Sequence, residues 1–227
     1  MDRTIIEYYD RLAPRYDVER FGNAYGRFLD AQERAIISRF LPRCSEAVLD
    51  LGCGTGRLTD FSTVGSDASL ASIRLAAQRF PEKLFVGADA LALSFRENSF
   101  DAAFSFHVFM HLEVAAIRTI FGEVARVLKP GGVFVADVAS RFRRRIHGPM
   151  LGRETSDWHG STSLTQGEFG ALGASAGLRL QRTVGVALMP IHRIPNKFRG
   201  RLASLDRYLA AIAPDCASYL VGCFVKE

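Results

Sequence analysis

The stretch Val48-Leu49-Asp50-Leu51-Gly52-Cys53-Gly54-Thr55-Gly56 joins an apolar strand to an acid and three closely spaced glycines. In an open α/β sheet, ligands bind beyond the carboxyl ends of the strands, and glycines there let a ligand approach the backbone closely. This stretch therefore predicts an α/β fold with a nucleotide-like ligand at the end of its first strand.

The spacing of the glycines argues against two common nucleotide sites. A dinucleotide fingerprint has its third glycine at the sixth position, which is Arg57 here, whereas the third glycine comes at Gly56. A P-loop needs a lysine followed by Ser or Thr after its last glycine, and Arg57-Leu58 supplies neither. NAD, ATP and GTP are therefore not expected.

The glycine stretch and three later parts of the chain resemble, in the same order, the class I S-adenosylmethionine-dependent methyltransferases. The later parts are Val64-Gly65-Ser66-Asp67-Ala68-Ser69, Gly87-Ala88-Asp89-Ala90 with Ser99-Phe100-Asp101-Ala102-Ala103-Phe104-Ser105, and Leu128-Lys129-Pro130-Gly131-Gly132-Val133-Phe134-Val135. The resemblance covers roughly residues 5–138. It implies a Rossmann-like, seven-stranded, mostly parallel sheet with the last strand antiparallel and helices on both faces, and S-adenosylmethionine as the cofactor.

The amino-terminal block Tyr8-Tyr9-Asp10-Arg11-Leu12-Ala13-Pro14-Arg15-Tyr16-Asp17 is similar to the small-molecule (type 11) branch, which includes ubiquinone and menaquinone methyltransferases. In such enzymes this segment covers the cofactor. If the segment is helical up to Pro14, Tyr9 and Tyr16 fall near one face, where they cover the ligand or pack in the core.

The resemblance also implies roles within the cofactor site. Asp50 and the glycines hold the methionyl part, Asp67 binds the ribose, Asp89 and Ala90 bind the adenine, and Phe106 walls the site near the methyl group. The complete cofactor set is Tyr9, Tyr16, Asp50, Gly52, Cys53, Gly54, Gly56, Asp67, Ala68, Asp89, Ala90 and Phe106.

The first crossover of the chain is short. Asp67 follows Gly52 by 15 residues, whereas the acid of a dinucleotide fingerprint lies about 20 residues on. Residues 57–62 therefore form little more than one helical turn. A non-catalytic relative that binds the cofactor weakly stays an alternative.

Two histidines, His107 and His111, follow the fourth expected strand, where a methyl acceptor approaches. Either is a candidate general base for transfer to a hydroxyl. Their spacing of four also suits a metal, but no metal site is expected, because the carboxylates that related quinone enzymes carry near this point are replaced here. His111-Leu112 matches a pair that is usually structural in the family, and His159 is a further candidate for acceptor recognition.

Length and composition indicate one domain. With 227 residues, 48% of them apolar, the chain can bury one sizeable core. Residues 1–227 are expected to form a single methyltransferase domain, with a helical lid at 1–41 and acceptor-side insertions at 139–164 and 189–213. The four cysteines lack C-x-x-C spacing, so free thiols and a cytoplasmic location are expected. No apolar stretch is long enough to span a bilayer.

The net charge of +5 comes mostly from arginine, clustered in residues 141–145 and 193–201. These clusters are either a solvated face or attract an anionic substrate, a membrane surface or nucleic acid. A nucleic-acid methyltransferase is the rival function, although no reading motif supports it. The expected acceptor is a small or lipid-like molecule that offers an oxygen, nitrogen or carbon nucleophile. A helix at roughly 198–212 carries the apolar residues Phe198, Leu202, Leu205 and Leu209, which would contact a membrane, the sheet or a twin subunit. Monomer and homodimer both stay open.

Overall fold

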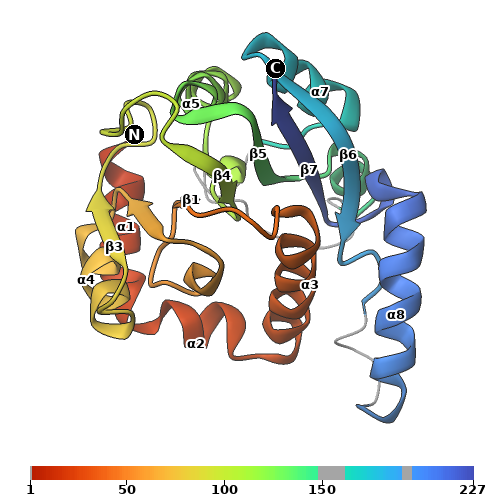
Figure 1. The fold of residues 1–227 in the computed structure, drawn as a ribbon. Helices are drawn as coiled ribbons and strands as arrows, with labels where there is room; N and C mark the ends of the chain where they lie inside the picture. Colours follow the sequence, from red (N-terminus) through yellow and green to blue (C-terminus); the bar gives the residue numbers. More distant parts are fainter. Residues whose placement is uncertain (1, 148–161, 191–195) are drawn as a thin grey trace.

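A seven-stranded sheet forms the centre of the computed structural model, which describes residues 2–147, 162–190 and 196–227 (Figure 1). The strand order is β3-β2-β1-β4-β5-β7-β6, with β1 to β6 parallel and β7 antiparallel between β5 and β6. This confirms the class I topology. The strands are β1 (Val48–Leu51), β2 (Val64–Asp67), β3 (Leu84–Gly87), β4 (Phe100–Ser105), β5 (Leu128–Ala139), β6 (Leu178–Val186) and β7 (Tyr219–Lys226).

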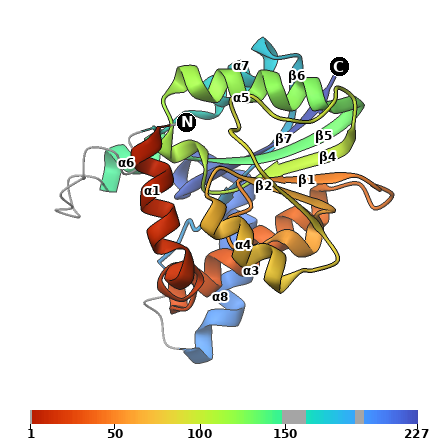
Figure 2. The same cartoon turned by 90° about the vertical axis from the view of Figure 1, so that its left-hand side faces the viewer.

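Helices cover both faces of the sheet (Figure 2). α5 and α7 lie on one face, and α3, α4 and α8 lie on the other, while α1 stands at the edge where the parallel strands end. The helices are α1 (Arg3–Leu12), η1 (Ala13–Arg15), α2 (Tyr16–Phe21), α3 (Ala24–Phe40), η2 (Thr59–Phe61), α4 (Leu70–Arg79), η3 (Phe109–His111), α5 (Val114–Val127), α6 (Arg141–His147), α7 (Gln166–Ser175), α8 (Asn196–Ile212) and η5 (Pro214–Cys216).

Successive side chains of a strand point to opposite faces of the sheet, and helices cover both faces, so side chains on both faces are buried. In β4, Ala102 and Phe104 pack with α3, whereas Ala103 packs beneath α5 and α7. Phe121 of α5 has its ring 5.3 Å from Phe224, in an edge-to-face arrangement. This two-sided packing keeps the strand ends in place where the ligand site begins.

Local signals place most helix ends. The Thr165 and Glu168 capping box opens α7, and Gly177 follows α7 with a φ of +74°. α3 begins at Ala24, where the Asn23 side chain accepts the Gly26 N–H at 2.8 Å. α5 ends at Val127, before Pro130, and Leu128 already belongs to β5.

The first crossover contains only the three-residue turn η2, which confirms the expected short connection. Lys83 supports it by donating to the carbonyl oxygens of Thr59 and, at 2.9 Å, Ser62. The Thr59 hydroxyl donates to the Asp50 carboxylate at 3.2 Å. The shortened crossover therefore delivers a hydrogen-bond donor beneath the acid that ends β1.

The apolar stripe of α8, for which the sequence left a membrane, the sheet or a second subunit open, is only partly covered in the structure. Leu205 is 44% exposed, whereas Asp206 is fully buried and accepts hydrogen bonds from the Gln32 amide and the Met189 N–H, both at 2.6 Å. The buried carboxylate is satisfied by these donors, so it replaces leucine on the inner face. The Phe198 side chain lies outside the described residues.

Candidate cofactor and acceptor site

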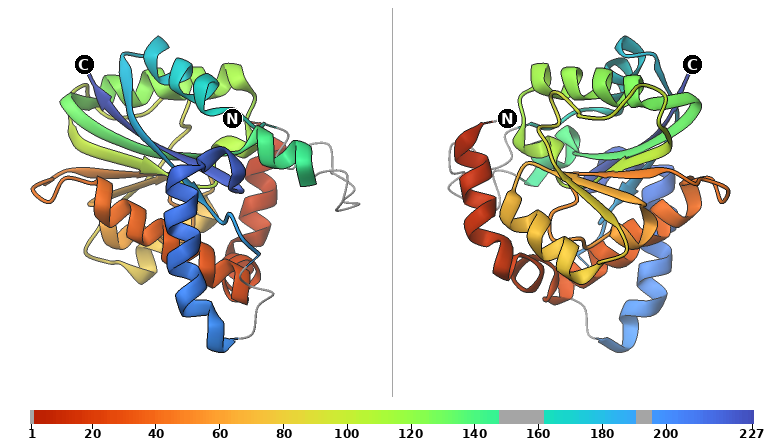
Figure 3. Two further views of the ribbon diagram at one scale, coloured as in Figure 1. Left: turned by 90° about the vertical axis from the view of Figure 1, so that its right-hand side faces the viewer. Right: turned by 60° about the vertical axis from the view of Figure 1, so that its left-hand side comes forward.

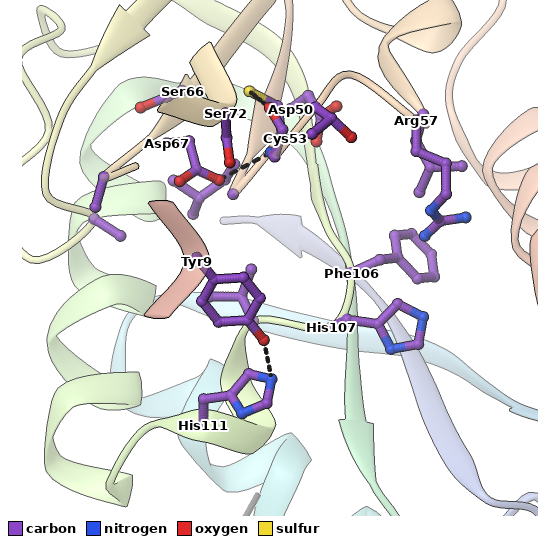
Figure 4. A pocket seen from close by; sticks show the side chains of 18 of the residues that line it. Tyr9, Asp50, Cys53, Arg57, Ser66, Asp67, Ser72, Phe106, His107 and His111 are labelled. Atoms are coloured by element: carbon purple, nitrogen blue, oxygen red, sulfur yellow. Dashed lines mark hydrogen bonds between the residues drawn. The ribbon is translucent and has the colours of Figure 1, made fainter. Parts of the chain in front are cut away.

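A pocket opens at the carboxyl ends of β1, β2 and β4 (Figure 4). It contains about 990 Å³ of unfilled space, counting the part open to solvent. Figure 4 shows Asp50 and Asp67 toward one end of the pocket and His107 and His111 toward the other.

The glycine loop adopts a conformation that depends on its glycines. Gly52, Gly54 and Gly56 have φ values of +76°, +53° and +88°. A Cβ atom on Gly52 would lie 2.3 Å from a methyl group of Val108, whereas a Cβ on Gly54 would meet no atom within 4 Å. The loop is therefore pressed against the end of β4 at Gly52 and leaves open space at Gly54.

Two buried acids line the cofactor end of the pocket. Burial raises the pKa of Asp50 to about 7, a shift that Arg57 and Lys83 oppose and Asp67 enhances. Asp67 accepts the N–H groups of Gly54 and Ser69, both at 2.8 Å, and burial also raises its pKa. Both carboxylates are thus held in an environment that favours a ligand with hydrogen-bond donors or positive charge.

Of the residues expected to contact an adenine, Ala90 lines the pocket and Asp89 does not. Ala68, Ala88 and Ala90 line the pocket, as do Cys53 and Phe106. The Asp89 side chain is not among the lining residues, although its carboxylate accepts the Leu91 N–H at 2.9 Å in the turn that carries Ala88 and Ala90. The role of Asp89 toward an adenine stays a prediction.

The segment α1–η1–α2 closes the pocket from outside, and both expected tyrosines, Tyr9 and Tyr16, line it. Their ring centroids are 6.0 Å apart. The Asp10 carboxylate accepts the Ser69 hydroxyl at 2.6 Å, and that of Asp17 accepts the Thr55 hydroxyl at 2.8 Å. These hydrogen bonds tie the lid to the cofactor loop and to the start of α4.

His111 pairs with the lid. Its Nε2 lies 2.9 Å from the Tyr9 hydroxyl, and the two rings are 5.7 Å apart. Burial raises the pKa of Tyr9, so this hydroxyl stays protonated at ordinary pH. The pair therefore places an imidazole nitrogen and a hydroxyl group together at the acceptor end of the pocket.

His107 is held between two buried acids. Its Nε2 lies 2.6 Å from Glu33 and its Nδ1 lies 3.6 Å from Asp137, which also accepts the His107 backbone N–H. Burial alone would lower the pKa of His107, but the two carboxylates outweigh burial and raise it. Both ring nitrogens thus face acceptors, an arrangement that suits a charged imidazolium and not a general base.

Arg57, which occupies the place of a dinucleotide glycine, joins the same buried cluster. Its guanidinium forms ion pairs of 2.7 Å with both Asp30 and Glu33 and lies 3.8 Å from the ring centre of Phe21. Glu33 therefore bridges Arg57 of the cofactor loop and His107 of the β4 end.

The sequence analysis did not predict that the acids Glu33, Asp137 and Asp30 lie beside the pocket, in contact with His107 or Arg57. Glu33 had a usable signal, because it interrupts the apolar face of α3 between Leu29 and Ile37 and is only 1% exposed. Asp137 is likewise a charged residue inside the apolar strand β5. His159 and parts of the expected acceptor insertions at 139–164 and 189–213 lie outside the described residues.

The residues present fit S-adenosylmethionine. The pocket joins an open backbone cradle at Gly54 to two buried carboxylates, and the buried Ser66 hydroxyl has no hydrogen-bond partner in the described part of the chain. Carboxylates suit ribose hydroxyls and an ammonium group, and aromatic rings such as those of Tyr9 and Tyr16 suit a sulfonium cation. The sheet order and the pocket at the strand ends are those of the class I S-adenosylmethionine-dependent methyltransferase fold.

Comparison with known proteins agrees. Residues 49–136 match the family described as a methyltransferase domain, a similarity that covers the glycine loop and the strands around the pocket and fits S-adenosylmethionine as the ligand. A SAM-dependent methyltransferase of Thermotoga maritima, described as a possible histamine N-methyltransferase, has the same fold: the TM-score is 0.73 at 17% identity, over 96% of this chain and 98% of that one.

Two curated relatives overlap with this chain in part. An uncharacterized protein of Methanocaldococcus jannaschii is 39% identical over 60% of this chain and 52% of its own length. The demethylmenaquinone methyltransferase of Thermus thermophilus is 34% identical over 56% of this chain and 62% of its own length. The chain thus spans about half to three-fifths of these relatives. In the part that the structure describes, helices lack the combination of length and apolar character needed to cross a membrane.

Cofactor affinity should fall as the pH drops below about 7, because a cationic ligand favours the ionised Asp50. With the pKa of Asp50 near 7, protonation should make the dissociation constant at pH 6 roughly tenfold that at pH 8. Calorimetric titration of S-adenosylmethionine across this range measures the effect. The Asp50→Asn variant should give a nearly flat profile, and a flat profile in the unaltered protein would contradict the prediction.

Proposed function

We propose that this chain transfers a methyl group from S-adenosylmethionine to an uncharged or lipid-like small molecule that carries a hydroxyl group. The main support for this proposal is the acceptor end of the pocket. Its walls are formed by Tyr9, Tyr16, Phe106 and Val108, and it contains the Tyr9–His111 pair. Aromatic and aliphatic walls suit a planar or hydrophobic acceptor. The relative named demethylmenaquinone methyltransferase supports an acceptor of this kind.

Alignment and exclusion of water are the main tasks of the protein in this proposal. Bound S-adenosylmethionine supplies a methyl group activated by its sulfonium. Asp50, Asp67 and the glycine loop orient the cofactor, while the lid, tied down through Asp10 and Asp17, keeps water out. The new bond joins the methyl carbon to the acceptor oxygen, the sulfur–methyl bond breaks, and its electron pair returns to sulfur.

The proton of the acceptor hydroxyl passes to His111 in this proposal. The Tyr9 hydroxyl accepts that proton and donates its own to His111 Nε2, which lies 2.9 Å away. His107 serves instead as a positioning residue, since its Nε2 lies 2.6 Å from Glu33 and its Nδ1 lies 3.6 Å from Asp137. Its backbone, with a φ of +61°, sets the turn that carries Phe106 and Val108 into the pocket.

Replacing His111 with glutamine should lower kcat for a hydroxyl acceptor about 100-fold, the scale of a lost general base. The dissociation constant of S-adenosylmethionine should stay within about twofold, because no binding carboxylate changes. Steady-state kinetics and calorimetry measure the two quantities. Tyr9→Phe should lower kcat in the same direction, and a normal kcat for His111→Gln would leave alignment alone as the catalytic device.

The proposed function is tested by titrating the protein with S-adenosylmethionine and S-adenosylhomocysteine and then assaying labelled methyl transfer. The acceptor panel should hold hydroquinones, phenols, sterols and matched amines. Micromolar binding with transfer to a hydroxyl supports the proposal. Binding without transfer to any hydroxyl acceptor, or no binding at all, contradicts it.

A further inference from the structure

The arginine-rich helix α6 uses most of its arginines inside the protein. Arg141 donates to the Ser163 carbonyl oxygen at 2.9 Å and pairs with Glu168, and Arg143 donates to the Cys216 carbonyl oxygen at 3.2 Å. Arg144 is half-buried, and burial lowers its pKa. Only Arg145 is classed as exposed among these arginines, so the cluster is largely structural.

The outward face of α6 combines this arginine with two large apolar side chains. Phe142 is 47% exposed and Ile146 is 49% exposed. Phe142, Arg145 and Ile146 have the three- and four-residue spacings that place side chains on one face of a helix. We refer to these three residues as the α6 face.

The α6 face rests on a rigid base. The Ser140 hydroxyl accepts the Arg143 N–H at 3.2 Å and donates to the Asp215 carbonyl oxygen at 2.6 Å. The helix therefore starts directly from the end of β5 and is joined to η5. Exposure of Phe142 and Ile146 does not come from a loosely attached segment.

This face lies next to the acceptor end of the pocket. α6 begins two residues after Ala139 of β5, which pairs with Tyr219 of β7, and the Tyr219 ring lies 5.2 Å from that of His107 in the pocket wall. Figure 2 shows α6 and the lid helix α1 at the same edge of the sheet, and the left view of Figure 3 shows α6 projecting beyond it. A surface that binds α6 would therefore face the acceptor side of the site.

The net positive charge of the chain comes from two helices, α6 and α8. By sequence, α6 and α8 hold eight of the Lys and Arg residues and a single acid, Asp206, so the remainder of the chain has a net charge of −2 against a total of +5. Asp206 is fully buried. On α6 itself, residues 141–147 contain no acid and Arg145 is the exposed arginine, so the outward face of this helix is apolar and positive.

From this geometry we infer that the α6 face docks onto an anionic lipid bilayer. Phe142 and Ile146 would enter the interface between headgroups and acyl chains while Arg145 contacts lipid phosphates. Charge complementarity selects this partner, and the paired exposed apolar residues distinguish it from nucleic acid, which phosphate-binding arginines alone would serve. Docking does not require methyl transfer, but it would deliver a lipid-like acceptor at the pocket.

The test is flotation of the full chain with phosphatidylcholine vesicles containing 0 or about 30% phosphatidylglycerol. Binding should require the anionic lipid and weaken with salt. Arg145→Glu should lower the partition coefficient about 20-fold or more, since each basic residue near the surface contributes about fivefold. Phe142→Ala should lower it about fivefold to tenfold, in keeping with partial burial of the ring.

α8 supplies the matched control. It exposes a comparable apolar strip, with Leu205 at 44%, Tyr208 at 65% and Ile212 at 64%. Leu205→Ala with Ile212→Ala should leave vesicle binding within about twofold, and all variants should keep the affinity for S-adenosylhomocysteine, which separates docking from the cofactor site.

Several outcomes would overturn the inference. They are equal binding to neutral vesicles, no binding to either kind, normal binding by Phe142→Ala and Arg145→Glu, or loss of binding only in the α8 variant. Light scattering that shows the α6 variants breaking a dimer without affecting vesicle binding would assign this face to a second copy instead.

Discussion

Replacing Glu33 with alanine should lower the free energy of unfolding by about 3–5 kcal/mol, the scale for removing one partner of a buried ion pair. Glu33 is 1% exposed and faces Arg57 at 2.7 Å and His107 at 2.6 Å. Its loss leaves two cationic groups buried without their shared acid. For a chain of this size the melting temperature should drop by roughly 6–20 °C in thermal denaturation.

A matched control is Glu19→Ala. Glu19 is 46% exposed and pairs with Arg15 at 3.3 Å, so its loss should change stability by no more than about 0.5 kcal/mol. Glu33→Gln, which keeps an acceptor toward His107, should fall between the two. A loss below 1 kcal/mol for Glu33→Ala would show that the cluster relaxes around the missing acid.

The effect of Glu33 should depend on pH. Burial favours the neutral acid, but His107 and Arg57 outweigh burial and lower the pKa of Glu33, while Glu33 and Asp137 raise that of His107. The stabilisation from His107 is therefore complete below its unfolded pKa of about 6.5 and is lost as the pH rises through the higher folded value. The difference between Glu33→Ala and the unaltered protein should shrink at alkaline pH, with the Arg57 pair remaining.

Asp67→Ala should weaken binding of S-adenosylmethionine by about 2–3 kcal/mol, or roughly 30- to 150-fold. Two effects contribute. The expected ribose acceptor is lost, and the Gly54 and Ser69 N–H groups that the carboxylate holds are released, which loosens the glycine loop. Calorimetry with S-adenosylmethionine and S-adenosylhomocysteine measures the change, and both ligands should lose affinity alike because they share the ribose.

Asp60→Ala is the matched control for Asp67. Asp60 lies on η2 in the same crossover, is 53% exposed and pairs with Arg34, outside the pocket. Its loss should leave the affinity within about twofold. Asp67→Asn, which keeps one oxygen toward the loop, should retain part of the binding, and an unchanged affinity for Asp67→Ala would move the ribose acceptor to another residue.

The cofactor half of the site could be predicted from the sequence because most of its residues lie close together along the chain. The residues from Asp50 to Gly56 form one loop whose backbone conformation depends on glycine, and Asp67 ends the neighbouring strand. Tyr9 and Tyr16 could be placed over the pocket through family resemblance, since helical spacing alone left core packing equally open. Asp89 shows the limit of this reasoning, because its neighbours line the pocket and its own side chain does not.

The acceptor half could not be anticipated, since its residues come from distant parts of the chain. Sequence left both His107 and His111 as candidates, four residues apart after the same strand, although His111 belongs to a pair that is usually structural in the family. Only packing separates them: α3 and β5 bring Glu33 and Asp137 to His107, whereas α1 brings Tyr9 to His111. A pattern of residue types carries no information about which distant carboxylate will adjoin a histidine.

By itself, the sequence determined the short first crossover and the cofactor loop, because glycine conformation and spacing act over a few residues, and its resemblance to a known family implied the sheet topology. Tertiary structure alone decided the raised pKa of His107, the burial of Asp206 in place of Leu205, and the division of the α6 arginines between the interior and an exposed face. The physical reason is that pKa values and burial depend on neighbours, and those neighbours are set by packing between segments far apart in the chain.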